Sequence, residues 1–458
     1  MDLTRFYGTD MKSKIKRLFD VFVPIFVTQT AIYGMTFFDT MMSGHAGAPQ
    51  LAGTAIGANL WMPIFATVNG ILLAATPIIA HLIGGKQRQD VGKVIRHGLM
   101  LSIVFSLLLI VAAVLLLPLL LDILKLEPVV EHVAVYYLAG IGMGIVPFFM
   151  GTVLRALLDT LGGTSLTMKI YLLALPINGF LNYILIFGKL GLPALGGIGA
   201  GVATGITCWL VFGMFVFVVK KHPSYQDIKI LEGHLNFNKA LVKEYLHIGV
   251  PIGLTIFMES GIFAVVVLLQ AKFGTTVIAA SQAAMCFSNL LYMLPLSVAM
   301  SMTIIIGVEA GARRWKNARQ YGNLSLTFNG FCALFLPAIC YVLRYPIAWM
   351  YVTEPEVIDY TVLFVIYSCF FIMMDAIASP VQGILRGYKD VRAPFVASFI
   401  AYWLVCTPAG LVLDLVFHRG PAAYWEGLDL GMFAFAFILL LRLIQIRKRI
   451  KRKYKRIT

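Results

Sequence analysis

Long apolar runs separated by short polar segments recur along the whole chain. A helix needs about 20 residues to cross the hydrocarbon core of a bilayer, and windows of about 19 residues locate such runs. They predict twelve membrane-spanning helices, at residues 18–40, 51–82, 96–121, 132–156, 165–188, 194–219, 246–271, 278–311, 323–346, 357–384, 392–416 and 429–447. The pattern therefore predicts an all-α polytopic membrane protein.

The second half of the chain repeats features of the first at an offset of 227 residues. The offset aligns VPI at 23–25 with VPI at 250–252, Thr28 with Thr255, and Gly34 with Gly261. Six spans per half give both copies the same orientation, so the predicted repeat is parallel. We predict four segments: an N-terminal six-helix bundle over 1–221, a cytoplasmic linker over 222–243, a C-terminal six-helix bundle over 244–447 and a basic cytoplasmic tail over 448–458.

The charged residues add a topology to this pattern. Only 13% of the residues are charged and 59% are apolar, whereas about 25% are charged in soluble proteins. Counted on alternate sides of the predicted spans, 32 of the 37 Lys and Arg residues lie on one side, as is typical of the cytoplasmic side. We therefore expect a cell-membrane protein with both termini in the cytoplasm. The net charge of +15 then needs no nucleic-acid partner, although the basic tail is suited to contact anionic membrane lipid.

Motifs for nucleotide or metal chemistry are missing from the sequence. It contains no G-x-x-x-x-G-K-[ST] loop, no H-E-x-x-H and no histidine cluster of metal-binding spacing. The glycines of LGGIGAG at 195–201 open an apolar run without a preceding strand, so we interpret them as small residues for close helix packing. The sequence indicates a protein that is not an enzyme.

Three acidic residues stand inside predicted spans, where acids are costly. Asp39 lies in the first span, Glu259 in the seventh and Asp375 in the tenth, and none has a Lys or Arg within a helical turn. An Asp at the bilayer centre costs about 2.5–3.5 kcal/mol on insertion scales, so such acids are candidates for function. The alternatives are an exposed acid at the outer interface for Asp39 and a structural hydrogen bond between helices for the other two. Glu309 is less informative, because it precedes the bases Arg313 and Arg314.

Uncharged polar residues and prolines within the spans support a site in the membrane. Asn178 and Asn182 are one turn apart, so they share a helix face. Further polar candidates are Thr204, Gln282 and Tyr292. Each of these side chains could instead serve only as an interhelical hydrogen bond. Prolines such as Pro24 can weaken or bend their helices.

Several segments together resemble the MATE (multidrug and toxic compound extrusion) transporters, and the likeness covers nearly the whole chain. These segments are FFDTMMSG, PINGFLNYILIFGKLGLPALGGIGAGVAT and MMDAIASPVQGILRGYKD. The pair Glu259 and Asp375 resembles the NorM-like branch, whose members export organic cations in exchange for a cation, many of them using Na⁺. The resemblance implies the fold of two six-helix bundles predicted above.

The resemblance also implies roles for individual residues. Glu259 and Asp375 would bind the coupling cation, Na⁺ or H⁺, in the C-terminal bundle. Some NorM-like proteins have a Tyr one turn before the second acid, where this chain has Phe371, so a Na⁺ site would need another ligand. In the N-terminal bundle, the implied polar cluster comprises Asp39, Asn178, Asn182 and Thr204, and Pro24 would bend the first helix.

The buried acids and the repeat predict a secondary active multidrug efflux antiporter. It would export small organic cations in exchange for Na⁺ or H⁺, with alternating access between the two bundles, and would need no cofactor beyond the coupling ion. We expect it to be a monomer. The alternative is a flippase for a lipid-linked precursor, but Lys and Arg, which would hold a pyrophosphate, are nearly absent from the middle of the spans. A membrane-embedded enzyme and a channel are further alternatives.

Overall fold

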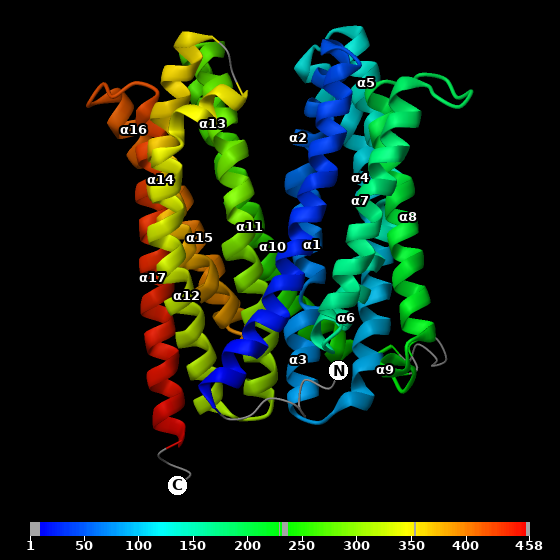
Figure 1. The fold of residues 1–458 in the computed structure, drawn as a ribbon, viewed down its shortest axis with the longest axis vertical. Helices are drawn as coiled ribbons and strands as arrows, with labels where there is room; N and C mark the ends of the chain where they lie inside the picture. The colour runs from blue at the N-terminus through cyan, green and yellow to red at the C-terminus, as the bar shows by residue number, and fades with distance from the viewer. Residues whose placement is uncertain (1–9, 229, 231–236, 352–353, 455–458) are drawn as a thin grey trace. The chain divides into compact units, whose positions relative to one another are not determined.

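The computed structural model describes residues 10–228, 230, 237–351 and 354–454, and within them the chain is helical, without a β-strand (Figure 1). Eleven helical segments of the described chain are long and apolar enough to cross a membrane. A twelfth span results when Pro128–Gly142 and Ile145–Thr160, bent by 45° at a short break, are counted as one. The predicted all-α fold of twelve spans is therefore confirmed, and the break explains why one span divides into two helices.

The helices form two compact units, and the second unit combines two separate stretches of the sequence. Of the described residues, unit 1 contains those from Val23 to Gly253, and unit 2 contains those from Leu254 to Tyr454 together with the beginning of the first helix, up to Phe22. The helices α1 (Met11–His45) and α10 (Lys239–Gln270) each contribute to both units. These divisions lie close to Pro24 and Pro251, the prolines that the repeat aligns, and they differ from the sequence-based boundaries at 221 and 244.

Unit 1 is built from the five spans that follow α1, together with shorter elements. Its remaining elements are α2 (Ala48–Leu72), α3 (Ala75–Gly84), the 3₁₀-helix η1 (Arg88–Asp90), α4 (Val91–Leu124), α5 (Pro128–Gly142), α6 (Ile145–Thr160), α7 (Thr164–Phe187), α8 (Gly197–Lys221) and α9 (Pro223–Gln226). Within this unit α8 packs against α5, α6 and α7.

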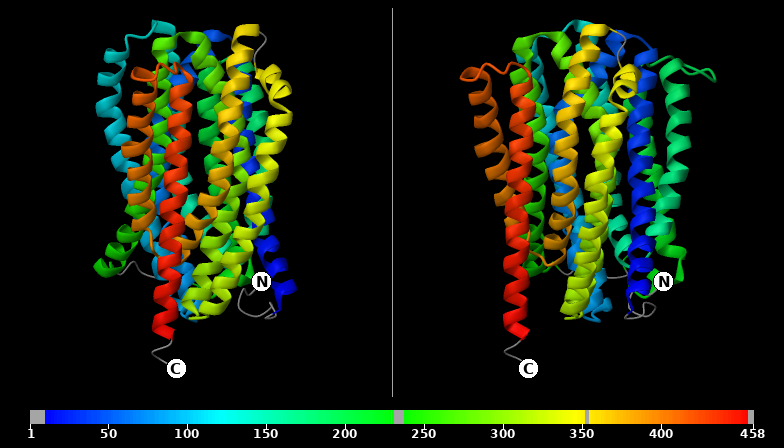
Figure 2. Two further views of the ribbon diagram at one scale, coloured as in Figure 1. Left: turned by 90° about the vertical axis from the view of Figure 1, so that its left-hand side faces the viewer. Right: turned by 60° about the vertical axis from the view of Figure 1, so that its left-hand side comes forward.

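Unit 2 is centred on α14, which packs against α11, α12 and α17. Its elements after α10 are η2 (Ala271–Phe273), α11 (Thr275–Gly311), α12 (Trp315–Val342), α13 (Arg344–Tyr351), α14 (Pro355–Gly387), α15 (Arg392–Ser398), the π-helix η3 (Phe399–Cys406), α16 (Thr407–Leu415) and α17 (Ala422–Tyr454). Figure 2 shows α17 running the length of the unit beside the α15–η3–α16 segment.

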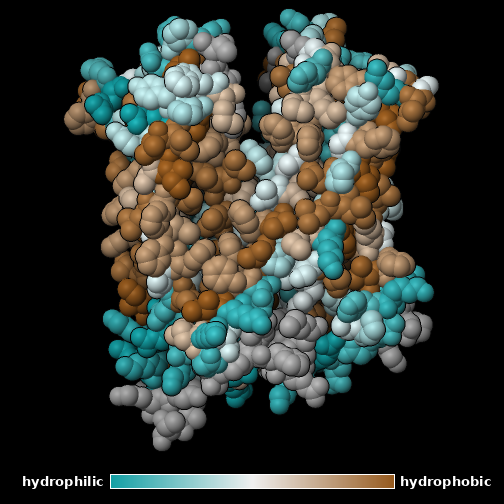
Figure 3. Space-filling view, in the orientation of Figure 1, coloured by the Kyte–Doolittle hydropathy of each residue, from teal (hydrophilic) through white to brown (hydrophobic). Residues whose placement is uncertain are grey.

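Apolar side chains cover the middle of each unit, and hydrophilic side chains gather at its ends (Figure 3). The most apolar span, in α4, has a mean hydropathy of 3.1, and only 11% of its most apolar stretch is buried inside the protein. Exposed side chains such as Leu115 and Ile123, each 70% exposed, would be unfavourable in water and are suited to lipid. The surface therefore matches a chain that crosses a bilayer many times.

The linker predicted at 222–243 folds against unit 1 where it is described. Arg88 Nε lies 2.6 Å from Asp227 Oδ2, and the backbone N–H of Asn238 donates to His97 Nε2 at 3.0 Å. Tyr225 is buried, and burial raises the pKa of its phenol to about 12. The described parts of this segment thus belong to unit 1.

Close packing in unit 1 depends on glycines of α5 and α8. A Cβ atom at Gly201 would lie 2.3 Å from Tyr137 O, and one at Gly205 would lie 2.4 Å from Gly140 O. Real Cβ atoms do not approach a carbonyl oxygen so closely, so the two backbones can meet only where glycine stands. The interpretation of the segment at 195–201 as a helix-packing motif is confirmed.

We expect Gly201→Ala to destabilise the protein by about 1–3 kcal/mol, because overpacking forces the backbones apart. The measurement is the thermal unfolding midpoint of the protein purified in detergent. Gly213→Ala on the same helix is the control, since no atom lies within 4 Å of its Cβ position. An equal fall in both midpoints would contradict the close approach of α5 and α8.

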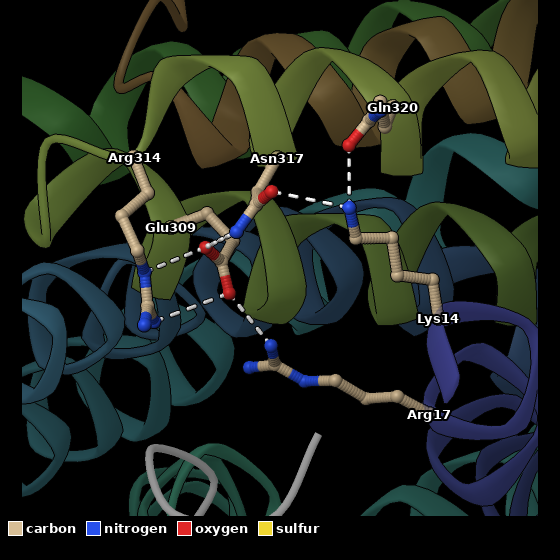
Figure 4. Close-up of polar contacts among 6 residues, drawn as sticks. All are labelled: Lys14, Arg17, Glu309, Arg314, Asn317 and Gln320. Carbon is tan, nitrogen blue, oxygen red and sulfur yellow. Dashed lines mark hydrogen bonds and ion pairs between the residues drawn. The ribbon is translucent and has the colours of Figure 1, made fainter. Parts of the chain in front are cut away.

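A buried ion cluster fastens the first part of α1 within unit 2 (Figure 4). Arg17 Nη1 lies 2.6 Å from Glu309 Oε1, and Arg314 Nε lies 2.8 Å from Glu309 Oε2. The side chains of Arg17 and Glu309 are only 3% and 2% exposed. Nearby, Lys14 Nζ donates to Asn317 Oδ1 at 3.1 Å and also to Gln320.

We expect Glu309→Gln to lower stability by about 3–5 kcal/mol, because it breaks the buried ion pair between Arg17 and Glu309. Asp90→Asn is the control: its partner Lys93 is 63% exposed, and an exposed pair contributes about 0–1 kcal/mol. Thermal midpoints of both variants and of Arg17→Gln/Glu309→Gln test this, with part of the loss recovered in the double variant. A Glu309→Gln protein as stable as the Asp90→Asn control would refute the cluster's role.

Candidate functional site

Unit 1 places Asp39 in a polar cluster formed by three helices. Asp39 extends from α1, Asn182 from α7 and Thr204 from α8. The amide of Asn182 donates to Asp39 Oδ1 at 2.5 Å, and the hydroxyl of Thr204 donates to Asp39 Oδ2 at 2.8 Å. Both carboxylate oxygens are therefore bound by neutral donors.

The cluster continues into the interior of unit 1 through α7. Asn182 Nδ2 also lies 3.2 Å from Asn178 Oδ1, because residues one turn apart share a helix face. Asn178 Nδ2 in turn donates to Thr207 Oγ1 at 3.4 Å. Both asparagines are buried, and Asp39 is half-buried. The alternative of a freely exposed outer acid does not fit these contacts.

Unit 2 holds the other two acids in a second cluster. Gln382 Nε2 donates to Glu259 Oε1 at 2.7 Å, which joins α14 to α10. Ser379 Oγ donates to Asp375 Oδ1 at 2.7 Å, one turn along α14. Asp375 is buried and Glu259 is half-buried, and the two carboxyl groups interact electrostatically. Asp375, Ser379 and Gln382 thus line one face of α14, and Glu259 meets it.

Two tyrosines and one arginine complete the surroundings of the second cluster. Tyr292 on α11 and Tyr402 in η3 interact electrostatically with both Glu259 and Asp375. Arg386, one turn beyond Gln382 on α14, interacts electrostatically with Glu259. The π-helical turns around Tyr402 are notable, because such segments are rare and occur frequently at functional sites.

The position of Phe371 supplies no oxygen ligand. Its ring packs against Phe263 of α10 with 5.7 Å between ring centroids. Oxygen atoms near the acids are instead offered by Ser379, Tyr292 and Tyr402. Among the described residues, no group of three or more His, Cys, Asp or Glu side chains is arranged to hold a metal ion. A Na⁺ ion in this cluster would therefore need carboxylate oxygens together with amide or hydroxyl oxygens, which the cluster contains.

Within the described chain, two further residues of the sequence-based site are not hydrogen-bonded to either cluster. Gln282 on α11 is exposed, and among the described residues it has no hydrogen bond to either cluster. Pro24 lies inside α1, and Thr28 Oγ1 donates to its carbonyl oxygen at 2.8 Å. The structure thus brings Asp39, Asn178, Asn182 and Thr204 together in unit 1, and Glu259, Asp375 and Tyr292 in unit 2.

Four residues of the second cluster are missing from the sequence-based site. Ser379, Gln382 and Arg386 follow Asp375 at four, seven and eleven positions, the spacing of one helix face, so helical periodicity could have identified them. Tyr402 lies in the apolar run FIAYWLVC, and no feature of that run signals a π-helix. Its place beside the acids arises from tertiary packing.

Comparison with known proteins identifies the relatives of this chain. The MatE family model matches residues 24–184 and 251–412, and the two matches begin 227 residues apart, the offset of the internal repeat. The chain is 46% identical to the "Probable multidrug resistance protein NorM" of Halalkalibacterium halodurans over 442 residues, which are 96% of each chain. It is 41% identical to the protein of that name from Bacillus subtilis, with 96% and 98% of the chains covered.

Solved structures of low sequence identity share the fold. A mutant of the Vibrio cholerae MATE transporter VcmN superimposes with a TM-score of 0.88 at 18% identity, over 96% of this chain and 99% of that one. The eukaryotic MATE transporter AtDTX14 gives a TM-score of 0.86 at 20% identity, over 97% and 99% of the two chains. The two matches of the family model and the full-length relatives show that this chain belongs to the MATE family, in its NorM-like branch, and is a membrane transporter rather than an enzyme.

Proposed function

We propose that the protein is a secondary active multidrug efflux antiporter that exports small organic cations in exchange for Na⁺ or H⁺. The observation that carries this proposal is the presence of Glu259 and Asp375 together inside unit 2, within spans where acids are costly. Their contacts are mostly with neutral groups that can rotate or exchange partners. The names of the relatives, which call them multidrug resistance proteins, support the substrate class.

The chemistry of the unit 2 cluster suits a coupling ion. A buried carboxylate is stabilised by a proton, by Na⁺ or by an organic cation, and each excludes the others from the same oxygens. Asp375 has Ser379 as a donor, and Glu259 has Gln382. Neither donor neutralises the negative charge of its carboxylate, so both acids can attract a cation, Asp375 without a positive side chain among its hydrogen-bond partners. Arg386 supplies a positive charge near Glu259 that would replace the cation after its release.

The Asp39 cluster in unit 1 is the second place where a cation can be held. Among the described residues no Lys or Arg forms an ion pair with Asp39. Its two oxygens are instead oriented by Asn182 and Thr204. We assign this cluster to binding of the organic cation or of a proton that exchanges with it.

Transport follows if access to these clusters alternates between the two sides of the membrane. Binding of the coupling ion favours one conformation, and binding of the organic cation favours the other. Each ligand shifts the population toward the conformation for which it has the higher affinity. We propose both termini to be cytoplasmic, because the bases collect on their side, and the protein to function as a monomer.

The test uses the protein reconstituted into vesicles, with a fluorescent organic cation as substrate. A Na⁺ gradient and a pH gradient are imposed separately, and the accumulation of the dye is recorded in each case. We expect at least one gradient to drive accumulation against the dye's own gradient. Failure of both, combined with movement of a lipid-linked pyrophosphate between leaflets, would replace the antiporter by the flippase.

A further inference from the structure

A buried acid on α17, Asp429, belongs to neither carboxylate cluster. The residue is only 9% exposed, and its Oδ1 atom is buried without a hydrogen-bond partner among the described residues. No Lys, Arg or His of the described chain forms an ion pair with it. A buried carboxylate without a counter-charge is unfavourable, and a bound proton removes that charge. Asp429 is therefore suited to hold a proton.

The side chain of Asp429 faces α14. Trp425, one turn earlier on α17, stacks on Phe364 of α14 with 5.6 Å between ring centroids. Glu426, also one turn earlier, accepts a hydrogen bond from the hydroxyl of Tyr367 on α14 at 2.8 Å. Residues three and four apart share a helix face, so Asp429 lies at the same interface, one turn farther along α17.

The interface between α14 and α17 leads from Asp429 toward the unit 2 cluster. The two contacts just described follow the same order in both helices, so the helices run in the same direction. Counted from the contact of Phe364 with Trp425, Asp429 lies four residues along α17 and Asp375 lies eleven residues along α14. The difference is two helical turns, or about 10 Å.

The hydroxyl of Tyr402 lies between these two levels. It donates to Met432 Sδ at 3.2 Å, and Met432 follows Asp429 by three residues, on the same face of α17. Tyr402 also interacts electrostatically with both Glu259 and Asp375. A tyrosine hydroxyl can accept and donate a hydrogen bond, so it can connect Asp429 to the cluster.

The titratable groups that face Asp429 are acids. They are Glu426 on its own helix, the thiol of Cys369 on α14 and the thiol of Cys406 in η3. The neighbouring base Arg419 is already paired with Glu426. Among the described residues, no three His, Cys, Asp or Glu side chains are arranged to hold a metal ion. A proton is therefore the cation that this position can take.

We propose that Asp429 binds a proton and relays it, through the Tyr402 hydroxyl, between the end of unit 2 where α17 begins and the Glu259–Asp375 cluster. In the inward step the Asp429 O–H bond breaks, the Tyr402 oxygen takes that proton, and the hydroxyl gives its own proton to a carboxylate of the cluster. A proton from water at the beginning of α17 then restores Asp429. The relay rests on the antiport proposed above and assigns the proton as its coupling ion.

The test measures accumulation of a fluorescent organic cation by full-length protein in vesicles, driven by a pH gradient without Na⁺. Asp429→Asn keeps the size and neutrality of the protonated side chain but cannot release a proton. Its initial rate should fall by about tenfold or more, because a positioned acid–base group contributes about a hundredfold or more to a proton-transfer step. Asp429→Glu restores a carboxyl group and should retain more of the rate. Asp359→Asn, the same change at an exposed residue of α14, should leave the rate unchanged.

Two further measurements separate a relay from a structural role. Exchange of labelled for unlabelled organic cation, at equal concentrations on both sides, needs no net proton movement and should remain in Asp429→Asn. The infrared C=O stretching band of protonated carboxyl groups, recorded at neutral pH, should be weaker in Asp429→Asn than in Asp359→Asn. Equal bands would show that Asp429 carries no proton and would overturn the proposal.

The transport outcomes distinguish the relay from the antiport. Accumulation driven by the pH gradient at the full rate in Asp429→Asn would overturn the relay and leave the antiport intact. So would accumulation by the unchanged protein that only Na⁺ drives. Equal losses of pH-driven accumulation and of exchange in Asp429→Asn would assign the residue to structure and also overturn the relay. No accumulation by the unchanged protein under either gradient would contradict the antiport itself, and the relay with it.

Discussion

Replacing both carboxyl groups of the unit 2 cluster, in Glu259→Gln/Asp375→Asn, should abolish ion-driven efflux while the protein still folds. The amides keep the size of the side chains and can still accept the hydrogen bonds from Gln382 and Ser379. They cannot provide the negative charge that attracts Na⁺ or that accepts a proton. Charged hydrogen bonds contribute about 1.5–3 kcal/mol each, and each 1.4 kcal/mol is about tenfold in affinity. We therefore expect a loss of more than about a hundredfold for the double change.

The control for this prediction lies on the same helix. Glu356 and Asp359 are exposed residues at the beginning of α14, and Glu356→Gln/Asp359→Asn makes the same chemical change away from the cluster. Ion-driven dye accumulation is measured for both double variants, at equal amounts of folded protein. Full activity in Glu259→Gln/Asp375→Asn would remove these carboxylates from the coupling mechanism. Activity lost equally in the control would point to a general effect of charge on α14.

Asp39→Asn should lower transport of an organic cation by about tenfold or more, because it removes the negative charge of the unit 1 cluster. The new amide must also turn one N–H toward the amide of Asn182 or the hydroxyl of Thr204, both of which now donate to Asp39. Thr204→Val is the comparison, since it removes one donor and keeps the carboxylate. Its effect should be smaller.

Substrates of different charge distinguish binding of the organic cation by Asp39 from its other roles. If Asp39 binds the organic cation, Asp39→Asn should impair transport of a cationic dye more than transport of an uncharged dye of similar size. The measurement is the initial transport rate of each dye in the same vesicles, for Asp39→Asn and for the unchanged protein. Equal losses for both dyes would assign Asp39 to proton binding or to the structure of the cluster rather than to the substrate.

The sequence predicts the spans well because the bilayer imposes a simple rule on them. Each span needs about 20 apolar residues, and the described helices match all twelve predicted runs when α5 and α6 are counted together. The break between α5 and α6 lies at Met143 and Gly144, within an apolar run where hydropathy carries no signal.

The site could be predicted in part, as far as single helices determine it. The shared face of Asn178 and Asn182 follows from helical geometry, and their contact with each other is present. The same geometry places Arg386 on the face of α14 that carries Asp375. Tyr402 interacts electrostatically with Glu259 from another element, η3. Its position depends on how α10, α14 and η3 pack, which local sequence does not encode.

The burial and pairing of a charged residue in the first helix also could not be predicted from the sequence. Arg17 is one of the bases that mark the cytoplasmic side in the sequence, and its position there gives no sign of burial. In the structure it is buried against Glu309, almost three hundred residues away, beside the local partner Arg314. The assignment of α1 to both units arises from these long-range contacts and from the packing of its apolar residues.

The central claim is that the carboxylate clusters exchange an organic cation for Na⁺ or H⁺, and reversed coupling tests it most directly. Vesicles containing the protein are given a gradient of the organic cation alone, and the movement of radioactive Na⁺ and of protons is recorded. Antiport predicts that one of these ions moves against its own gradient, in the direction opposite to the organic cation, and that Glu259→Gln/Asp375→Asn abolishes this movement. Movement of the organic cation without either ion, or with an ion in the same direction, would contradict the account.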